Sequence, residues 1–120
     1  MMMDWNAYQK QVLTTVGEMA KLSPDTVRGY GMLSDAGSKT GHLEPKTREL
    51  ISLAVAVTTR CDGCITIHTD EAYKLGASRE EVMEALGVAI AMNAGAALVY
   101  SSRVMDAYAA KEAAAKAAGK

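Results

Sequence analysis

The sequence predicts an all-α fold, and three features of the 120-residue chain lead to this prediction. Apolar residues recur at steps of three and four along most of the chain, as they do on one face of a helix. Residues that favour helix starts, such as Ser23 before Pro24 and Ser78 before Glu81, divide these stretches. No segment shows the sustained alternation of apolar and polar residues that marks a half-buried strand. We therefore expect about six helices in one domain, because the chain is too short for two domains of ordinary size.

Two helices are expected in the first third of the chain. Asp4 is a suitable cap for a first helix that runs to about Leu22. Ser23 and Pro24 start a short second helix, since proline is tolerated at the first helical position. Residues 35–44 contain two glycines and several turn formers, so we expect a long loop there.

The third helix is expected to start at Pro45 and to contain Glu49 and the apolar run 51–57. This run is short and β-branched, so by itself it also fits a buried strand. A lone strand would leave its backbone groups without partners, and we therefore predict a helix. The run is apolar on nearly all sides, which in so short a chain predicts that neighbouring subunits cover it. We expect a homo-oligomer.

The remaining helices are expected to follow in quick succession. A fourth helix begins near Cys61, with the cysteines in its first turn, and ends at Gly76. Ser78 and Glu81 form a capping box that opens a fifth helix. Gly95 is expected to interrupt this helix, so that a sixth element follows and ends in a frayed, Ala-rich tail. The domain thus divides into an amino-terminal arm and loop (1–44), a core (45–100) and a carboxy-terminal helix (101–120).

Composition and charge restrict the partners of the chain. Its formal net charge is −1 and both signs are spread along the sequence, so it has no basic stripe for nucleic acid and no basic patch for a membrane. The first residues lack a basic segment followed by an apolar one, so we expect a cytoplasmic protein without a secretory signal. The longest nearly apolar stretch, 87–100, is shorter than the roughly 20 residues that span a bilayer, and we predict a buried helix pair there.

Both cysteines and one of the two histidines lie within eight consecutive positions. Cys61, Cys64 and His68 are three and four residues apart, so on a helix they share one face. In a reducing cytoplasm such a pair is more often catalytic or metal-binding than structural. Unpaired N–H groups at a helix start, the helix dipole and the imidazole all favour the reactive thiolate. Glu49, on the preceding helix, is placed to orient His68 and to accept its proton.

These residue types predict thiol redox chemistry. With a peroxide as substrate, a thiolate attacks the O–O bond and becomes a sulfenic acid. The second thiol then condenses with the sulfenic acid, which releases water and leaves a disulfide. An external dithiol restores the reduced pair.

The order of these residues resembles a known family. Arg48-Glu49-Leu50, the apolar run, Cys61-x-x-Cys64-x-x-x-His68 and Lys74-Leu75-Gly76-Ala77-Ser78-x-x-Glu81 are similar to the AhpD-like alkylhydroperoxidases of the carboxymuconolactone decarboxylase superfamily, over roughly residues 43–100. The resemblance implies an all-helical fold, trimers or hexamers, a peroxidatic Cys64 and a resolving Cys61. It also implies a proton relay through His68 and Glu49. The expected partners are a small hydroperoxide or disulfide and a thioredoxin-like or lipoyl dithiol reductant, and we expect no cofactor.

Gly63 departs from the pattern of some peroxidases of this family, which carry a histidine just before the second cysteine. The relay then lacks a member or uses water. Peroxidase turnover would suffer from this loss more than general disulfide oxidoreductase activity.

Three other interpretations fit the same residues. The two thiols and His68, with Glu49 or His42 as a fourth ligand, also suit zinc, which would make the chain a metal-binding or assembly module. Both cysteines also fit an inert role in the core, as free cysteines often do. A decarboxylase or isomerase on the same scaffold would work without the cysteines.

Overall fold

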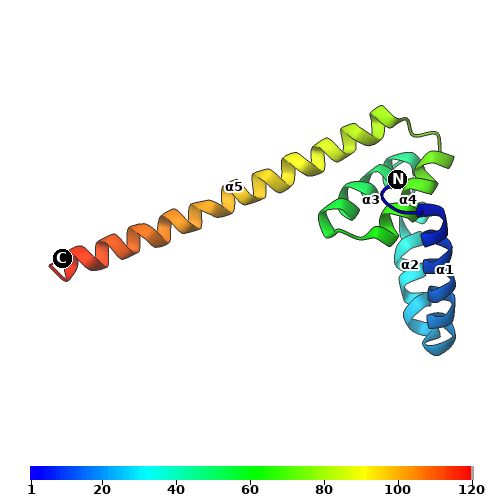
Figure 1. The fold of residues 1–120 in the computed structure, drawn as a ribbon, viewed down its shortest axis with the longest axis horizontal. Helices are drawn as coiled ribbons and strands as arrows, with labels where there is room; N and C mark the ends of the chain where they lie inside the picture. The colour runs from blue at the N-terminus through cyan, green and yellow to red at the C-terminus, as the bar shows by residue number, and fades with distance from the viewer. Residues whose placement is uncertain (120) are drawn as a thin grey trace.

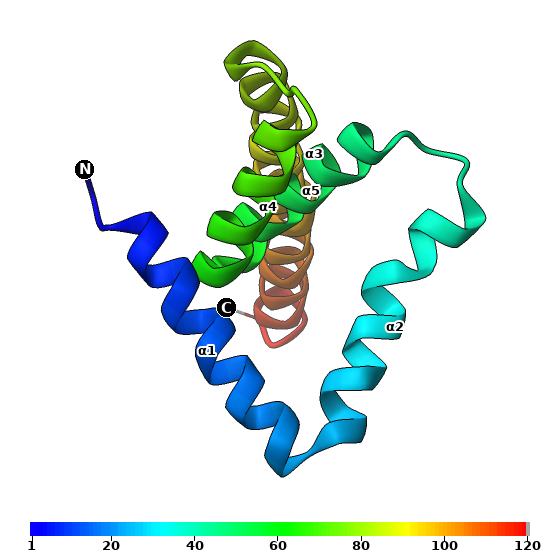
Figure 2. The same cartoon turned by 90° about the vertical axis from the view of Figure 1, so that its right-hand side faces the viewer.

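The computed structural model describes residues 1–119, which form five α-helices and no β-strand (Figure 1). The helices are α1 (Trp5–Leu22), α2 (Pro24–Thr40), α3 (Pro45–Thr59), α4 (Asp62–Lys74) and α5 (Arg79–Ala117). The all-α prediction is confirmed, with five helices in place of about six. Figure 2 shows α1 and α2 as a V that opens toward α3 and α4, and Figure 1 shows α5 extending far beyond the other helices.

The amino-terminal helices begin where their capping residues predict. The Asp4 carboxylate accepts a hydrogen bond from the backbone N–H of Ala7 at 3.0 Å, which satisfies one free donor in the first turn of α1. This helix ends at Leu22, as expected. Pro24 is the first residue of α2, where its missing N–H costs no hydrogen bond.

The loop predicted over 35–44 is wrong for residues 35–40, because α2 continues to Thr40. Turn-forming side chains in this segment bond to the helix itself. The Ser38 hydroxyl donates to the Asp35 carbonyl at 2.7 Å, which is compatible with helical backbone. The helix ends at Gly41, whose φ of 67° lies in the left-handed region that glycine adopts without strain. Only four residues therefore connect α2 to α3.

Helix α3 is the centre of the fold, because α4 packs on one part of it and α5 on another. The apolar run 51–57 is helical, as predicted. The core is small, and its buried side chains are Leu53 and Ala56 of α3, Thr66 and Ala72 of α4, and Ala89 of α5. Helix α1 joins this core through α4, where the buried Thr66 hydroxyl donates to the Trp5 carbonyl at 3.1 Å.

The start of α5 is fixed by both hydrogen bonds of the predicted capping box. The backbone N–H of Glu81 donates to the Ser78 hydroxyl at 3.0 Å, and the N–H of Ser78 donates to the Glu81 carboxylate at 3.1 Å. Lys46 at the start of α3 also bonds this carboxylate, at 2.8 Å, and this hydrogen bond lowers the pKa of Glu81. The capping box therefore also ties α5 to α3.

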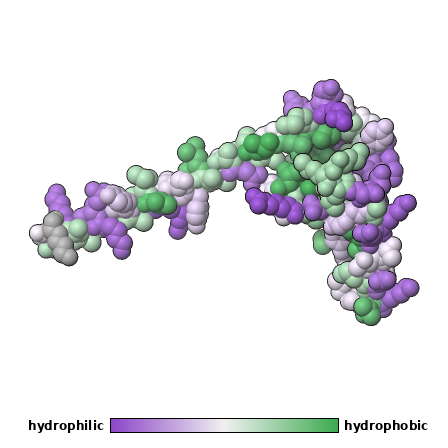
Figure 3. All heavy atoms as spheres, viewed as in Figure 1, coloured by the Kyte–Doolittle hydropathy of each residue, from purple (hydrophilic) through white to green (hydrophobic). Residues whose placement is uncertain are grey.

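Beyond its first turns, α5 differs from the expectations. It runs without a break to Ala117, so Gly95 does not interrupt it and the Ala-rich tail is helical. A single glycine costs a helix only about 1 kcal/mol relative to alanine, and the strong helix formers around Gly95 outweigh that cost. The buried helix pair predicted over 87–100 is one continuous helix with exposed apolar side chains, among them Met92, Leu98 and Tyr100 (Figure 3).

Helix α5 is long and apolar enough to cross a membrane by length and composition alone. It contains an 18-residue window with a mean hydropathy of 1.8, of which 6% is buried within the chain. Residues 87–100 were expected to be too short to cross a bilayer, but the longer apolar window of α5 that surrounds them meets the length and hydropathy criteria. Helices that pack between protein subunits have the same properties.

The chain is extended for its size. Its radius of gyration is 21.2 Å, whereas a compact chain of this length has a radius of about 14 Å. Its accessible surface is 9639 Å², and a compact protein of 12.7 kDa exposes about 6200 Å². The excess of about 3400 Å² includes most of α5 and exposed apolar side chains of α1 and α2, among them Met19 and Leu33.

Replacing Ser78 by alanine should lower the free energy of unfolding by about 1 kcal/mol, because the Glu81 N–H loses its cap. Urea unfolding at one protein concentration measures this difference. The control is Ser102→Ala, which removes a hydroxyl that bonds only within α5 and should change stability by less than about 0.5 kcal/mol. Equal destabilisation by the two substitutions would contradict a capping role for Ser78.

Candidate active site

Two neighbouring helices bring the predicted site residues together. Helix α3 carries Glu49, and α4 carries Cys64 and His68. The Nδ1 atom of His68 lies 2.7 Å from the Glu49 carboxylate, and the two side chains are 22% and 20% exposed. This is a short, charge-assisted hydrogen bond if the imidazole is protonated, and in either state it fixes the orientation of the ring. The Glu49–His68 contact expected from the sequence is therefore present.

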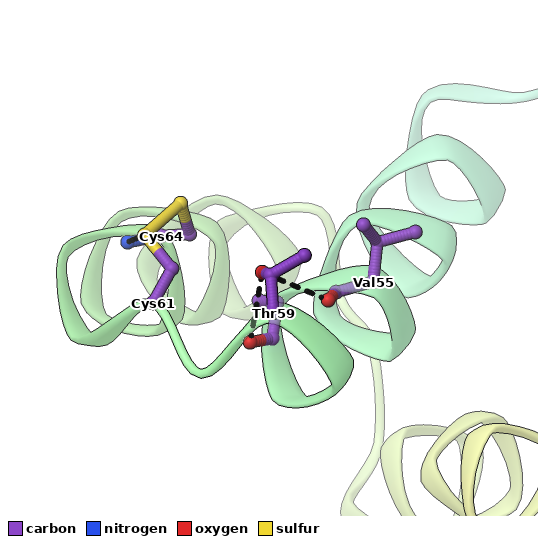
Figure 4. The surroundings of a disulfide bond; sticks show 5 residues. Val55, Thr59, Cys61 and Cys64 are labelled. Carbon is purple, nitrogen blue, oxygen red and sulfur yellow. Dashed lines mark hydrogen bonds between the residues drawn. A yellow bond between two sulfur atoms is a disulfide. The ribbon is translucent and has the colours of Figure 1, made fainter. Parts of the chain in front are cut away.

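The two cysteines form a disulfide at the start of α4 (Figure 4). Their Cα atoms are 5.2 Å apart, within the usual range for a disulfide. Cys61 was expected in the first turn, but its extended backbone makes it the residue that caps the helix. Its sulfur accepts a hydrogen bond from the Cys64 N–H at 3.1 Å. In the reduced protein this N–H group and the helix dipole would favour a thiolate at Cys61.

Cys64 and His68 line a common pocket between α3 and α4, with a volume of about 270 Å³. The remaining lining residues all come from α3 and are Ile51, Ser52, Val55, Ala56 and Thr59. Most of this wall is apolar, and two hydroxyl groups interrupt it. Cys61 does not line the pocket. The two sulfurs therefore differ in surroundings, with Cys64 beside the imidazole in the pocket and Cys61 at the helix cap.

Gly63 faces α1, on which it lies against Val12. A Cβ atom at this position would lie 3.7 Å from Val12 Cγ1, which is ordinary van der Waals contact. The first carbon of a side chain fits here, and the rest of it would have to extend along α1. The surface of α1 thus lies beside the position at which the resemblance would place a relay histidine.

Arg60 lies between α3 and Cys61, and no sequence pattern indicates its role. Its φ of 57° and ψ of 53° are left-handed, and it is the one non-glycine residue with positive φ in residues 1–119. This conformation costs a non-glycine residue roughly 1–2 kcal/mol. It lets the Cys61 N–H bond to the Ala56 carbonyl at 3.1 Å, which closes α3 and turns the chain toward α4.

The zinc and inert-core interpretations find little support in this arrangement. Within residues 1–119, no group of three or more His, Cys, Asp and Glu side chains is arranged to hold a metal ion. His42 is exposed in the connection between α2 and α3. Neither cysteine is fully buried, whereas an inert core cysteine usually is.

The fold and the site define a class of protein: an all-α domain with a Cys-x-x-Cys disulfide at a helix start, next to a histidine that a glutamate orients. The profile of the carboxymuconolactone decarboxylase family matches residues 24–107. The chain belongs to this family, as the resemblance of its motifs predicts.

Several relatives are similar over most of their length. An uncharacterised protein of Haemophilus influenzae is 48% identical over 113 residues, which cover 94% of this chain and all of the relative. The "uncharacterized protein 4 in cox locus" of Paracoccus denitrificans is 34% identical over 75% of this chain and 81% of its own length.

Two solved structures have the same fold. A carboxymuconolactone decarboxylase family protein from Legionella pneumophila, crystallised in an apo form, is 38% identical with a TM-score of 0.70, over 82% of this chain and 88% of its own. A protein from Methanobacterium thermoautotrophicum is 29% identical with a TM-score of 0.67, over 74% of this chain and 97% of its own.

Replacing Arg60 by glycine should raise the free energy of unfolding by about 1 kcal/mol, because glycine adopts the left-handed conformation without strain. Thermal or urea unfolding measures the change. The matched control is Arg60→Ala, which removes the guanidinium but keeps the Cβ atom, and which should give no such gain. If both variants gain equally, removal of the charge and not relief of strain is the cause.

Proposed function

We propose that the protein is a thiol-dependent hydroperoxide reductase that also acts as a disulfide oxidoreductase. The observation that supports this most is the shared pocket of Cys64 and His68, with Glu49 2.7 Å from the imidazole. A nucleophile, a base and a group that orients the base are thus arranged across two packed helices. The family includes enzymes, and the catalytic roles of these residues are part of the proposal.

The first step requires a thiolate at Cys64. When His68 donates its Nδ1–H to Glu49, its Nε2 atom is free to accept the thiol proton. The thiolate then attacks the terminal oxygen of the hydroperoxide. An S–O bond forms and the O–O bond breaks, so that the sulfur is oxidised to a sulfenic acid and the peroxide is reduced to an alkoxide. His68 returns its proton to the alkoxide, which leaves as an alcohol.

Cys61 completes the cycle as the resolving residue. Its sulfur, at the start of α4, attacks the Cys64 sulfur, and the S–O bond breaks. The leaving hydroxide takes up the proton that the Cys61 thiol gave up and departs as water. The product is the Cys61–Cys64 disulfide, which is the state of the structure. A thioredoxin-like or lipoyl dithiol supplies two electrons and two protons to regenerate the thiols. We place this reaction in the cytoplasm, where such dithiols are available.

Disulfide exchange is the second candidate activity, and Gly63 favours it. This position lies against α1 and supplies no additional proton-relay group. Exchange needs a thiolate and an accessible disulfide but no proton for an alkoxide, so it depends less on a complete relay. A decarboxylase or isomerase reaction on the same scaffold would be indifferent to both cysteines.

We also propose that copies of the chain assemble into a trimer or hexamer. The excess surface of about 3400 Å² per chain falls within the size range of obligate subunit interfaces. It includes large apolar side chains of α5, among them Leu98, which is 76% exposed. Monomeric soluble proteins rarely expose large contiguous apolar patches, and burial between copies would remove these side chains from water.

The Cys64→Ser variant should lose all dithiol-dependent consumption of an organic hydroperoxide, because its hydroxyl is not a competent nucleophile here. A coupled assay with a dithiol as electron donor measures the rate. Glu49→Gln should lower kcat by about 10²-fold, in line with the usual contribution of acid–base groups. His42→Ala is the control and should retain the wild-type rate. Equal rates for wild type and Cys64→Ser would refute the assignment of Cys64.

Light scattering at micromolar concentration should give the wild-type protein a mass of three or six chains. Leu98→Glu should shift this mass toward that of one chain, since a buried carboxylate without a partner is costly. Lys111→Glu, in the Ala-rich tail of α5, is the control and should leave the mass unchanged. A monomeric wild-type protein would contradict the assembly.

A further inference from the structure

Two hydroxyl groups line the pocket that Cys64 and His68 share, and both have their protons engaged within α3. The Thr59 hydroxyl lies 3.1 Å from the Val55 carbonyl and 3.4 Å from the Ala56 carbonyl. The Ser52 hydroxyl lies 2.9 Å from the Arg48 carbonyl. Carbonyl oxygens only accept hydrogen bonds, so each hydroxyl is the donor in these contacts. Both hydroxyls therefore offer lone pairs, not protons, to a molecule in the pocket.

The other side chains that line the pocket add no hydrogen-bond donor while His68 is neutral. His68 contacts Glu49 through Nδ1, so the Nε2 atom of its neutral form is an acceptor as well. Ile51, Val55 and Ala56 have apolar side chains. Before the thiol proton moves to His68, neutral His68 and the two hydroxyls are hydrogen-bond acceptors set in an apolar wall. A ligand that carries one O–H donor and an apolar remainder matches such a pocket.

We infer that Thr59 positions the substrate, by accepting a hydrogen bond from the terminal O–H of a hydroperoxide. Figure 4 shows Thr59 at the end of α3, on the side of Val55 that faces the disulfide. Ser52 lies two helical turns earlier on α3, about 10 Å away along the helix axis. The hydroperoxide group therefore binds at the Thr59 and Cys64 end, and its apolar substituent lies along Val55 and Ile51. This inference rests on the proposed peroxidase reaction.

In the attack on the O–O bond, Thr59 keeps the terminal oxygen close to the Cys64 sulfur. The S–O bond forms to this oxygen, which retains its hydrogen as part of the sulfenic acid. The O–O bond breaks with its electron pair on the alkoxide oxygen, which takes the proton held by His68. Thr59 neither gains nor loses a proton, so it is a positioning residue. Alignment of reacting atoms in this way is a large source of rate enhancement.

Thr59→Val tests this role, because valine has nearly the same shape but no hydroxyl. The reduced protein is mixed with tert-butyl hydroperoxide and, separately, with methyl methanethiosulfonate, a thiol reagent without an O–H or N–H donor. Loss of one hydrogen bond should slow the reaction with the hydroperoxide by about tenfold. The reaction with the thiosulfonate should not change, since it reports only the reactivity of the thiolates. Thr59→Ser keeps the hydroxyl and should retain most of the rate with both reagents.

Thr47→Val is the matched control, because Thr47 is an exposed threonine of the same helix outside the pocket. It should react with both reagents at the wild-type rate. Equal slowing of Thr59→Val toward both reagents, or no slowing toward the hydroperoxide, would overturn the role of Thr59. A wild-type protein that reacts with the thiosulfonate but not with the hydroperoxide would instead refute the peroxidase reaction itself. Far-UV circular dichroism confirms that each variant retains its helices.

Discussion

The packing of α3 against α4 is the constraint on which the site depends. The Glu49–His68 hydrogen bond, the pocket and the turn through Arg60 all lie between these two helices. Few large side chains are buried around them, so the position of each group relies on hydrogen bonds and on the short connection as much as on apolar packing. Arg60 keeps a strained backbone conformation in this connection. The contacts around the turn must therefore offset the energetic cost of that strain.

The two sulfurs have different environments although only two residues separate them. Cys61 occupies the cap, where backbone N–H groups and the helix dipole act on it. Cys64 occupies the pocket, where an imidazole and an apolar wall surround it. This asymmetry follows from the cap, since Cys61 has an extended backbone just outside α4 whereas Cys64 lies in the first helical turn. The start of α4 alone is therefore enough to give the Cys61 and Cys64 thiols different surroundings.

Local signals made much of the fold predictable from the sequence. The caps at Asp4 and Ser78, the proline starts and the three- and four-residue spacing of Cys61, Cys64 and His68 depend on neighbours within one or two turns, and the structure contains them. The contact of Glu49 with His68 was also foreseen, because a carboxylate and an imidazole on consecutive helices are suited to such a pair and the family resemblance implies it. The extension of α2 to Thr40 and the passage of α5 through Gly95 were not foreseen, because each glycine there has a small cost that the rest of the helix outweighs.

The parts of the site that the sequence did not reveal are Arg60, Thr59 and the contact of Gly63 with α1. These features depend on backbone conformation and tertiary packing, which no local pattern in the sequence records.

The long exposed stretch of α5 has a consequence for the order of folding. Contacts between α3 and α4 join residues close in sequence, so this pair can form early and quickly in an isolated chain. The apolar side chains at the far end of α5 have no such local partners in the described residues, so they stay in water until another molecule covers them. A newly made chain therefore passes through a period in which α3 and α4 already form the site while the apolar side chains of α5 are still exposed and prone to non-specific association. In the proposed assembly, the yield of folded protein during that period depends on how fast the chain meets another copy compared with other proteins that expose apolar surface.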